Sequence, residues 1–191
     1  MPLSGVLPCL NHLIFLSNKM KRLGFIFSVI NCISWATSID IAQYLARCAP
    51  QVAASTMHAI IKTESKYNPL AINLNTKGKR LLYQAKNLNQ AIAWVNYLES
   101  YGYNFDVGLG QINSKNIHAY VYKAHHLLDP CINLKVTSLI LLKNYQAAKL
   151  VSKNEQEALL KALSAYNSGN HRLGFKNGYV NKVVSNASFP R

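Results

Sequence analysis

Apolar side chains recur along this chain at intervals of three and four residues, which is the spacing of one face of an α-helix. Three stretches follow it: Met57, Ile60, Ile61 and Glu64; Leu88, Ala91, Ile92, Val95 and Leu98; and Leu159, Ala162, Leu163 and Tyr166. The 191 residues are enough for one domain with a hydrophobic core but few for two. The sequence therefore predicts a mainly α domain of the α+β class.

The expected helices are bounded by residues that favour helix ends. We expect helices over 39–47, 53–66, 88–98, 133–150 and 155–168. Asn133 is the expected N-cap of the long fourth helix, and Asn154 with Glu157 forms a capping box at the start of the fifth. Asn75-Thr76-Lys77-Gly78 is typical of a turn, so we expect one small β-hairpin within residues 71–84.

Glu64 is an acid on an apolar helix face, in a chain with only seven acidic residues against 21 basic ones. Loss of water around a carboxyl group disfavours its charged form and raises its pKa. A glutamic acid in that setting can donate a proton near neutral pH, as a general acid does. The alternative is a glutamate at a helix end whose side chain reaches solvent or a lysine.

The N-terminal segment has the pattern of an export signal. Met20-Lys21-Arg22 is basic, residues 23–33 are apolar, and Ser34-Trp35-Ala36 supplies small residues for cleavage. The apolar stretch is shorter than the roughly 20 residues of a membrane span. We expect translation to begin at Met20.

Cleavage is expected between Ala36 and Thr37, and it would leave no stable membrane span. The prediction divides the chain into an N-terminal extension and signal peptide over residues 1–36 and a functional domain over residues 37–191. The alternative is an uncleaved N-terminal anchor.

Cysteine content agrees with export. Cys9 and Cys32 lie in the segment that cleavage would remove, which leaves Cys48 and Cys131. An even pair in an oxidising compartment predicts a Cys48–Cys131 disulfide. Two free, buried thiols are the alternative.

The charge of the chain favours an anionic partner. Without residues 1–36 the chain has 18 basic residues against seven acidic ones, a formal charge of +11. Nucleic acid, anionic lipid and an acidic wall polymer would all suit such a surface. The alternative is a generally basic surface without a specific anion site. We expect no nucleic-acid partner, because the protein is exported and no basic helix stripe or aromatic platform stands out.

The histidines do not point to a metal site. His58, His118, His125, His126 and His171 show no metal-ligand spacing with cysteines or acids. We therefore expect neither a bound metal nor another cofactor.

Three short segments carry a family resemblance. They are Glu64-Ser65, Gly108-Leu109-Gly110-Gln111-Ile112-Asn113 and Ala165-Tyr166-Asn167-Ser168-Gly169. Their order and spacing resemble the soluble lytic transglycosylases, which share the goose-type lysozyme fold. One departure is Gly110, where many relatives carry Met, and we expect looser packing there.

Further segments resemble one branch of this family. They are Cys48-Ala49-Pro50, Asn104-Phe105-Asp106-Val107-Gly108 and Asp129-Pro130-Cys131-Ile132-Asn133-Leu134. They are similar to the specialised transglycosylases of type IV secretion and conjugation systems. The resemblance implies a lysozyme-like fold, a periplasmic location, peptidoglycan glycan strands as substrate, and secretion or conjugation machinery as partner.

The resemblance also implies a reaction, the cleavage of the MurNAc–GlcNAc β-1,4 bond with formation of 1,6-anhydro-MurNAc. Ordinary glycosidases use two carboxyl groups, whereas this reaction can proceed with one. Glu64 would protonate the bridging oxygen and then, as a carboxylate, accept the proton of the 6-hydroxyl group of the same sugar. The effective concentration of that internal nucleophile offsets the missing second carboxylate.

The same resemblance assigns further site residues. Ser65 would line the site, or bond its own helix backbone. Gln111 and Asn113 would hold the N-acetyl and hydroxyl groups of the sugar, or bond within their loop. Gly108, like Gly110, would allow the backbone to approach the sugar, or only shape the turn.

Aromatic and amide residues late in the chain complete the expected site. Tyr166 would orient Glu64 through its phenol group, or pack as a core aromatic residue. Asn167 is expected to brace its loop, and Tyr179 to close the cleft.

Two other functions remain open. Asp106 could be the second carboxylate of a muramidase-type hydrolase, although we expect it to cap a turn by accepting backbone N–H bonds before Gly108. A non-catalytic protein that binds the wall and serves as an assembly scaffold is the alternative of a different class.

Overall fold

The computed structural model describes residues 41–120 and 122–187, which belong to one compact unit. The predicted export signal, its start at Met20 and its cleavage after Ala36 lie outside the described residues. No helix within the described ranges has the length and hydropathy needed to cross a membrane.

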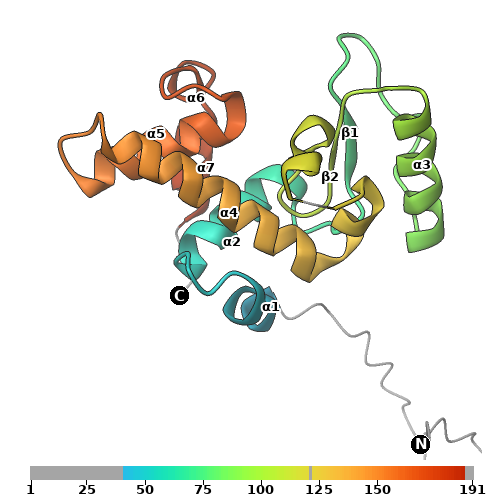
Figure 1. The fold of residues 1–191 in the computed structure, drawn as a ribbon, viewed down its shortest axis with the longest axis horizontal. Helices are drawn as coiled ribbons and strands as arrows, with labels where there is room; N and C mark the ends of the chain where they lie inside the picture. The colour runs from blue at the N-terminus through green and yellow to red at the C-terminus, as the bar shows by residue number, and fades with distance from the viewer. Residues whose placement is uncertain (1–40, 121, 188–191) are drawn as a thin grey trace, which may run out of the picture. The chain divides into compact units, whose positions relative to one another are not determined.

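Helices make up most of the described residues, as the sequence predicts (Figure 1). The α-helices are α1 (Ile41–Cys48), α2 (Ala54–Ser65), α3 (Leu88–Ser100), α4 (Pro130–Lys149), α5 (Glu155–Ser168), α6 (Leu173–Lys176) and α7 (Tyr179–Asn186). Two 3₁₀ helices, η1 (Ser114–Tyr120) and η2 (Ala124–Leu128), and three short strands, β1 (Ile72–Leu74), β2 (Phe105–Val107) and β3 (Ile112–Asn113), complete the fold. The mainly α prediction with a small β component is confirmed.

Helix α4 is the central element, packed against α1, α5 and η2 (Figure 1). It begins earlier than predicted, because Asp129 is its N-cap and accepts a hydrogen bond from the backbone N–H of Ile132 at 2.8 Å. Pro130 follows at the first helical position, where its missing N–H costs nothing. The prediction of Asn133 as N-cap is wrong, since this residue lies one turn inside the helix and is fully buried.

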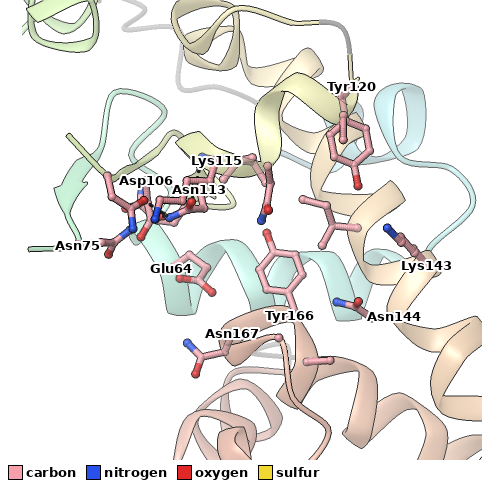
Figure 2. A pocket seen from close by; sticks show the side chains of 18 residues that line it. Glu64, Asn75, Asp106, Asn113, Lys115, Tyr120, Lys143, Asn144, Tyr166 and Asn167 are labelled. Carbon is pink, nitrogen blue, oxygen red and sulfur yellow. Dashed lines mark hydrogen bonds between the residues drawn. The ribbon is translucent and has the colours of Figure 1, made fainter. Parts of the chain in front are cut away.

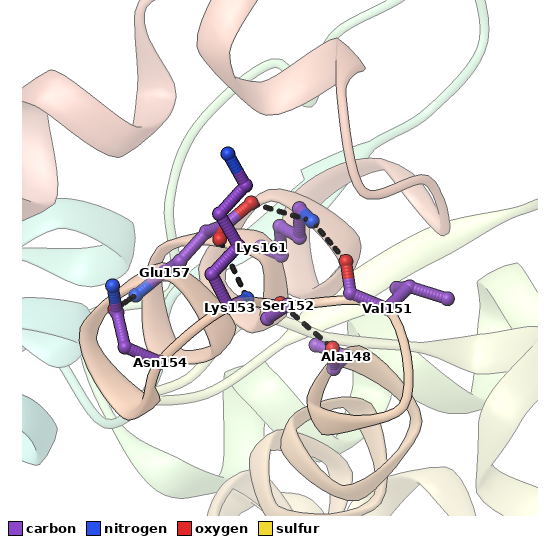
Figure 3. Close-up of polar contacts among 7 residues, drawn as sticks. All are labelled: Ala148, Val151, Ser152, Lys153, Asn154, Glu157 and Lys161. Atoms are coloured by element: carbon purple, nitrogen blue, oxygen red, sulfur yellow. Dashed lines mark hydrogen bonds and ion pairs between the residues drawn. The ribbon is translucent and has the colours of Figure 1, made fainter.

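The start of α5 agrees with the predicted capping box, with a shift of one residue (Figure 3). Asn154 accepts from the backbone N–H of Glu157 at 2.8 Å, as an N-cap does. The carboxylate of Glu157 accepts from the backbone N–H of Lys153, also at 2.8 Å, rather than from that of Asn154. Gly169 ends the helix in the left-handed conformation that glycine adopts readily at this position.

The predicted hairpin within residues 71–84 is wrong, since only its first strand forms. Strand β1 pairs antiparallel with the distant β2, and β2 pairs with β3, in the order β1-β2-β3. In place of a second local strand, the Gln84 side chain accepts from the N–H of Ile72 and donates to its carbonyl oxygen, at 3.1 and 2.7 Å. Pairing with β2 buries Phe105 and Val107 completely, which a hairpin of the polar 75–80 segment could not do.

The apolar face of α2 is buried as predicted. Met57 and Ile61 pack with α1 and Leu134, whereas Ile60 packs with α5 and α7. All three α2 side chains have no exposed surface. Because Glu64 follows on this face, the helix places its carboxyl group at the boundary between two groups of apolar side chains, one packed around Met57 and Ile61 and the other around Ile60.

A disulfide joins Cys48, at the end of α1, to Cys131, in the first turn of α4, with their Cα atoms 5.2 Å apart. The predicted pair is therefore present. It closes a chain segment with a sequence separation of 83 residues and ties the first helix to the central one.

Reduction of this disulfide is expected to destabilise the domain by about 4 kcal/mol, because the unfolded chain regains the entropy of the open loop. The measurement is thermal unfolding with and without a reductant. A Cys48→Ser/Cys131→Ser double variant serves as control, and its melting temperature should be low and indifferent to the reductant. Equal melting of the wild type in both conditions would contradict a stabilising role.

Candidate active site

A pocket of about 590 Å³ lies among α2, the sheet, η1, α4 and α5. Figure 2 shows its lining side chains, with Asn75, Asp106 and Asn113 on one side and Lys143 and Asn144 on the other. Of the described acidic residues, only Glu64 and Asp106 line it. Since most of its lining groups are amides, phenols and charged groups, the pocket suits a polar ligand.

The carboxyl group of Glu64 enters this pocket from the last turn of α2. Burial removes most of its water and raises its pKa to about 7, and the negative charge of Asp106 acts in the same direction. A hydrogen bond from Tyr179 and the positive charge of Lys182 oppose the rise in pKa without cancelling it. Glu64 can therefore give up and regain a proton near neutral pH.

The phenol group that contacts Glu64 belongs to Tyr179 rather than to Tyr166. The hydroxyl of Tyr179, at the first position of α7, donates to Oε1 of Glu64 at 2.6 Å. The prediction that Tyr166 orients Glu64 is wrong, since its hydroxyl donates to the carbonyl oxygen of Gly110, also at 2.6 Å. Both phenols have a raised pKa, first through burial and then through the nearby charge of Glu64, so both stay protonated donors.

Asp106 lies in the middle of β2 and not in a turn. The expectation that it caps a turn is wrong, because it accepts from the side-chain amide of Asn113, at 2.8 Å. Burial raises the pKa of Asp106, while hydrogen bonds from Asn113 and Asn75 lower it. Asp106 is therefore a second carboxyl group in the pocket, close enough to Glu64 to influence its protonation.

The amides of Gln111 and Asn113 bond within the protein. Gln111 donates to the carbonyl oxygens of Gly108 and Ala71, at 2.8 and 3.1 Å, and accepts from Asn73 at 2.7 Å. Asn113 donates to Asn104 and Asp106, and its side-chain oxygen accepts from the backbone N–H of Lys115. Both residues line the pocket, but their amides bond to protein groups, a few within the loop and most on the neighbouring sheet and its flanks.

The two glycines of this loop allow it to pack against α4. A Cβ atom at Gly108 would overlap the side chain of Asn133, and its φ of 77° is one that glycine adopts readily. A Cβ atom at Gly110 would overlap the hydroxyl of Thr137 and crowd that of Tyr166. The expectation of looser packing at Gly110 is therefore wrong, because the missing side chain lets helix and loop touch.

Asn133 holds the same loop in place and was not identified as a site residue from the sequence. Its side-chain oxygen accepts from the N–H of Gly110 at 2.7 Å, and its amide donates to the carbonyl oxygens of Val107 and Leu127, each at 2.9 Å. The signal that could have revealed it is an amide on the helix face that also carries Val136 at i+3, a position where an unpaired polar group would be costly.

The remaining predicted residues have structural contacts. The hydroxyl of Ser65 donates to the carbonyl oxygen of Ile61 at 3.1 Å, and Ser65 is not part of the pocket lining. Asn167 lines the pocket and accepts from Asn177 at 2.8 Å, which ties the end of α5 to the segment between α6 and α7. Within the described ranges no three histidine, cysteine or acidic side chains are grouped so that they could hold a metal ion.

Comparison with known proteins relates the chain to bacterial secretion proteins. It is 42% identical over 147 residues to "Type IV secretion system protein virB1" of Brucella abortus, covering 74% of this chain and 61% of the relative. It is 39% identical over 157 residues to "Protein virB1" of Rhizobium radiobacter, covering 81% and 64%. The chain thus spans about three fifths of the length of these relatives.

No solved structure gives a significant match. Residues 44–188 match the family "Transglycosylase SLT domain", a range that contains Glu64, the loop from Gly108 to Asn113, and Tyr179. The helical fold with its small antiparallel sheet agrees with this match. The chain belongs to the transglycosylase SLT domain family.

Proposed function

We propose that this protein is a peptidoglycan lytic transglycosylase that cleaves the β-1,4 bond between MurNAc and GlcNAc. The observation that carries the proposal is the carboxyl group of Glu64, which has a pKa of about 7 and opens into a polar pocket. Glycoside cleavage requires a general acid that is protonated near the working pH. Membership of the transglycosylase SLT family supports the same chemistry.

The first step breaks the glycosidic bond. Glu64 donates its proton to the bridging oxygen, the bond from that oxygen to the anomeric carbon breaks, and positive charge develops on the sugar that keeps this carbon. Glu64 becomes a carboxylate, which the hydrogen bond from Tyr179 stabilises. The negative charge of Asp106 in the same pocket favours the positively charged transition state.

The second step closes the ring. The carboxylate of Glu64 accepts the proton of the 6-hydroxyl group on the same sugar, and the oxygen of that group attacks the anomeric carbon. A 1,6-anhydro-MurNAc end forms, the carboxylic acid of Glu64 is restored and no water is consumed. The internal attack has a large effective concentration, so no second carboxyl group has to position a nucleophile.

A muramidase-type hydrolase is the second candidate, and Asp106 is the observation that favours it. Asp106 lines the pocket and raises the pKa of Glu64, as expected of a second carboxyl group near the reacting bond. In that reaction Asp106 would act on the anomeric carbon or on a water molecule, and the product would be a reducing sugar. We prefer the transglycosylase because Asp106 is held by Asn113 within the sheet.

For its biological setting, we propose that the protein acts in the periplasm and opens the wall locally for a type IV secretion or conjugation apparatus. The name of the Brucella relative, a type IV secretion system protein, supports this setting. Export would depend on the signal at residues 1–36, with the domain at residues 37–191 performing the reaction. A non-catalytic scaffold is disfavoured, because a buried acid with a raised pKa weakens a fold that does not use it.

Glu64→Gln is expected to reduce the clearing of wall suspensions by at least a factor of about 1,000, because glutamine cannot donate the proton. Glu99→Gln is the matched control, since Glu99 is exposed on α3 outside the pocket, and it should clear walls like the wild type. Mass spectrometry of the wild-type digest should detect 1,6-anhydro ends. Reducing ends would identify a hydrolase, and equal clearing by wild type and Glu64→Gln would reject the catalytic assignment.

The activity is expected to fall as the pH rises through about 7, since Glu64 must be protonated in the first step. Tyr179→Phe removes the hydrogen bond that lowers the pKa of Glu64. The alkaline limb of the kcat/KM profile, where activity falls with rising pH, should therefore shift to higher pH by about one unit. Tyr166→Phe is the control, because its hydroxyl bonds to Gly110, and its limb should stay in place. A shift of the alkaline limb in the Tyr166 variant alone would instead support the prediction that Tyr166 orients Glu64.

A further inference from the structure

Two lysines line the pocket, and they differ in their distance from its carboxyl groups. Figure 2 shows Lys115 on the same side as Asp106, while Lys143 lies on the opposite side with Asn144 and Tyr120 nearby. Lys143 and Asn144 are consecutive residues of α4, so one helix supplies both groups. Of the two lysines that line the pocket, Lys143 is therefore the one that lies away from both carboxyl groups.

Lys143 is not committed to another group of the protein. Ion pairs in the described part of the chain join Lys149 to Glu155 and Lys161 to Glu157, and both pairs lie outside the pocket. Figure 3 shows how the second pair is used, with Lys161 held between Glu157 and the carbonyl of Val151. No comparable contact is found for Lys143 within residues 41–120 and 122–187, and its ammonium group points toward the pocket in Figure 2.

We propose that Lys143 binds a carboxylate of the peptide stem carried by the muramic acid of the substrate, with the amide of Asn144 beside it. This inference rests on the proposed function and specifies which part of the polymer the site recognises. The sugar rings of a glycan strand carry hydroxyl and N-acetyl groups, whereas the stem peptide carries free carboxylates. A carboxylate bound at Lys115 would lie on the side of Asp106, which repels it, whereas a carboxylate bound at Lys143 lies away from both acids.

The position of Lys143 away from the two carboxyl groups would therefore orient the strand. With a stem carboxylate against Lys143, the neutral glycosidic bond can lie at Glu64, where added negative charge would raise the pKa further and hinder loss of the proton. Charge complementarity of this kind acts on selectivity and on productive orientation. The excess of basic residues in the domain at residues 37–191, 18 against seven acidic ones, favours the same polyanionic polymer from a distance.

The test uses soluble glycan strands in three forms: with intact stems, with stem carboxylates converted to amides, and with stems removed by an amidase to leave the lactyl carboxylate. Lys143→Gln should lower kcat/KM on intact strands by about threefold to fivefold, mainly through KM, as expected for an ion pair of an exposed lysine. It should have no effect on amidated or stripped strands. Lys143→Arg keeps the charge and should retain most of the activity.

Lys135→Gln is the matched control, since Lys135 is an exposed lysine on the same helix that does not line the pocket, and it should behave like the wild type. The dissociation constant of intact strands is measured in parallel in a Glu64→Gln background, where Lys143→Gln should weaken binding by the same factor. This binding measurement does not require turnover.

Each outcome bears on one of the two proposals. A loss of equal size on intact and amidated strands would mean a structural role for Lys143, and a loss that persists on stripped strands would assign the contact to the lactyl carboxylate. Either of these results, or no loss at all, would overturn the inference. Failure of the wild type to cleave any strand, with the binding difference still present, would overturn the proposed function alone.

Discussion

The carboxyl group of Glu64 sits at the end of an apolar helix face with little water around it, and much of the surrounding structure follows from that placement. Burial raises its pKa from 4.5 to about 7, so the folded state binds this proton more tightly than the unfolded state does. The contribution of this proton to the free energy of unfolding is complete below about pH 4.5. It is lost as the pH rises through 7, which lowers the free energy of unfolding by about 3 kcal/mol. The burial of Met57, Ile60 and Ile61 on the same helix acts against this loss.

The second requirement is that the glycine loop stays against α4 and beside Glu64. Asn133 meets it by bonding three backbone groups from inside the core, while Gly108 and Gly110 let the loop approach the helix. The same loop carries Gln111 and Asn113, which bond to the sheet and to Asp106. One buried amide thus couples the central helix to the side of the pocket that holds the second carboxyl group.

Local patterns predicted local structure well. The apolar faces of α2, α3 and α5, the buried setting of Glu64 and the Cys48–Cys131 pair all follow from spacing or composition. What the sequence could not predict depends on contacts between distant residues. The pairing of β1 with β2, the hydrogen bond from Tyr179 to Glu64 across 115 positions, and the role of Asn133 required the fold itself. Tyr166 and Tyr179 were both visible as candidates, but spacing along the chain cannot decide which phenol reaches the acid.

The most direct test of the central claim is a titration of the Glu64 carboxyl group itself, followed by carbon NMR in protein labelled at its glutamates. The resonance is assigned by its absence from Glu64→Gln. We predict that it titrates at about pH 7 in the folded protein. A midpoint near the ordinary value of 4.5 would show a solvated glutamate, and would contradict the buried general acid on which the mechanism rests.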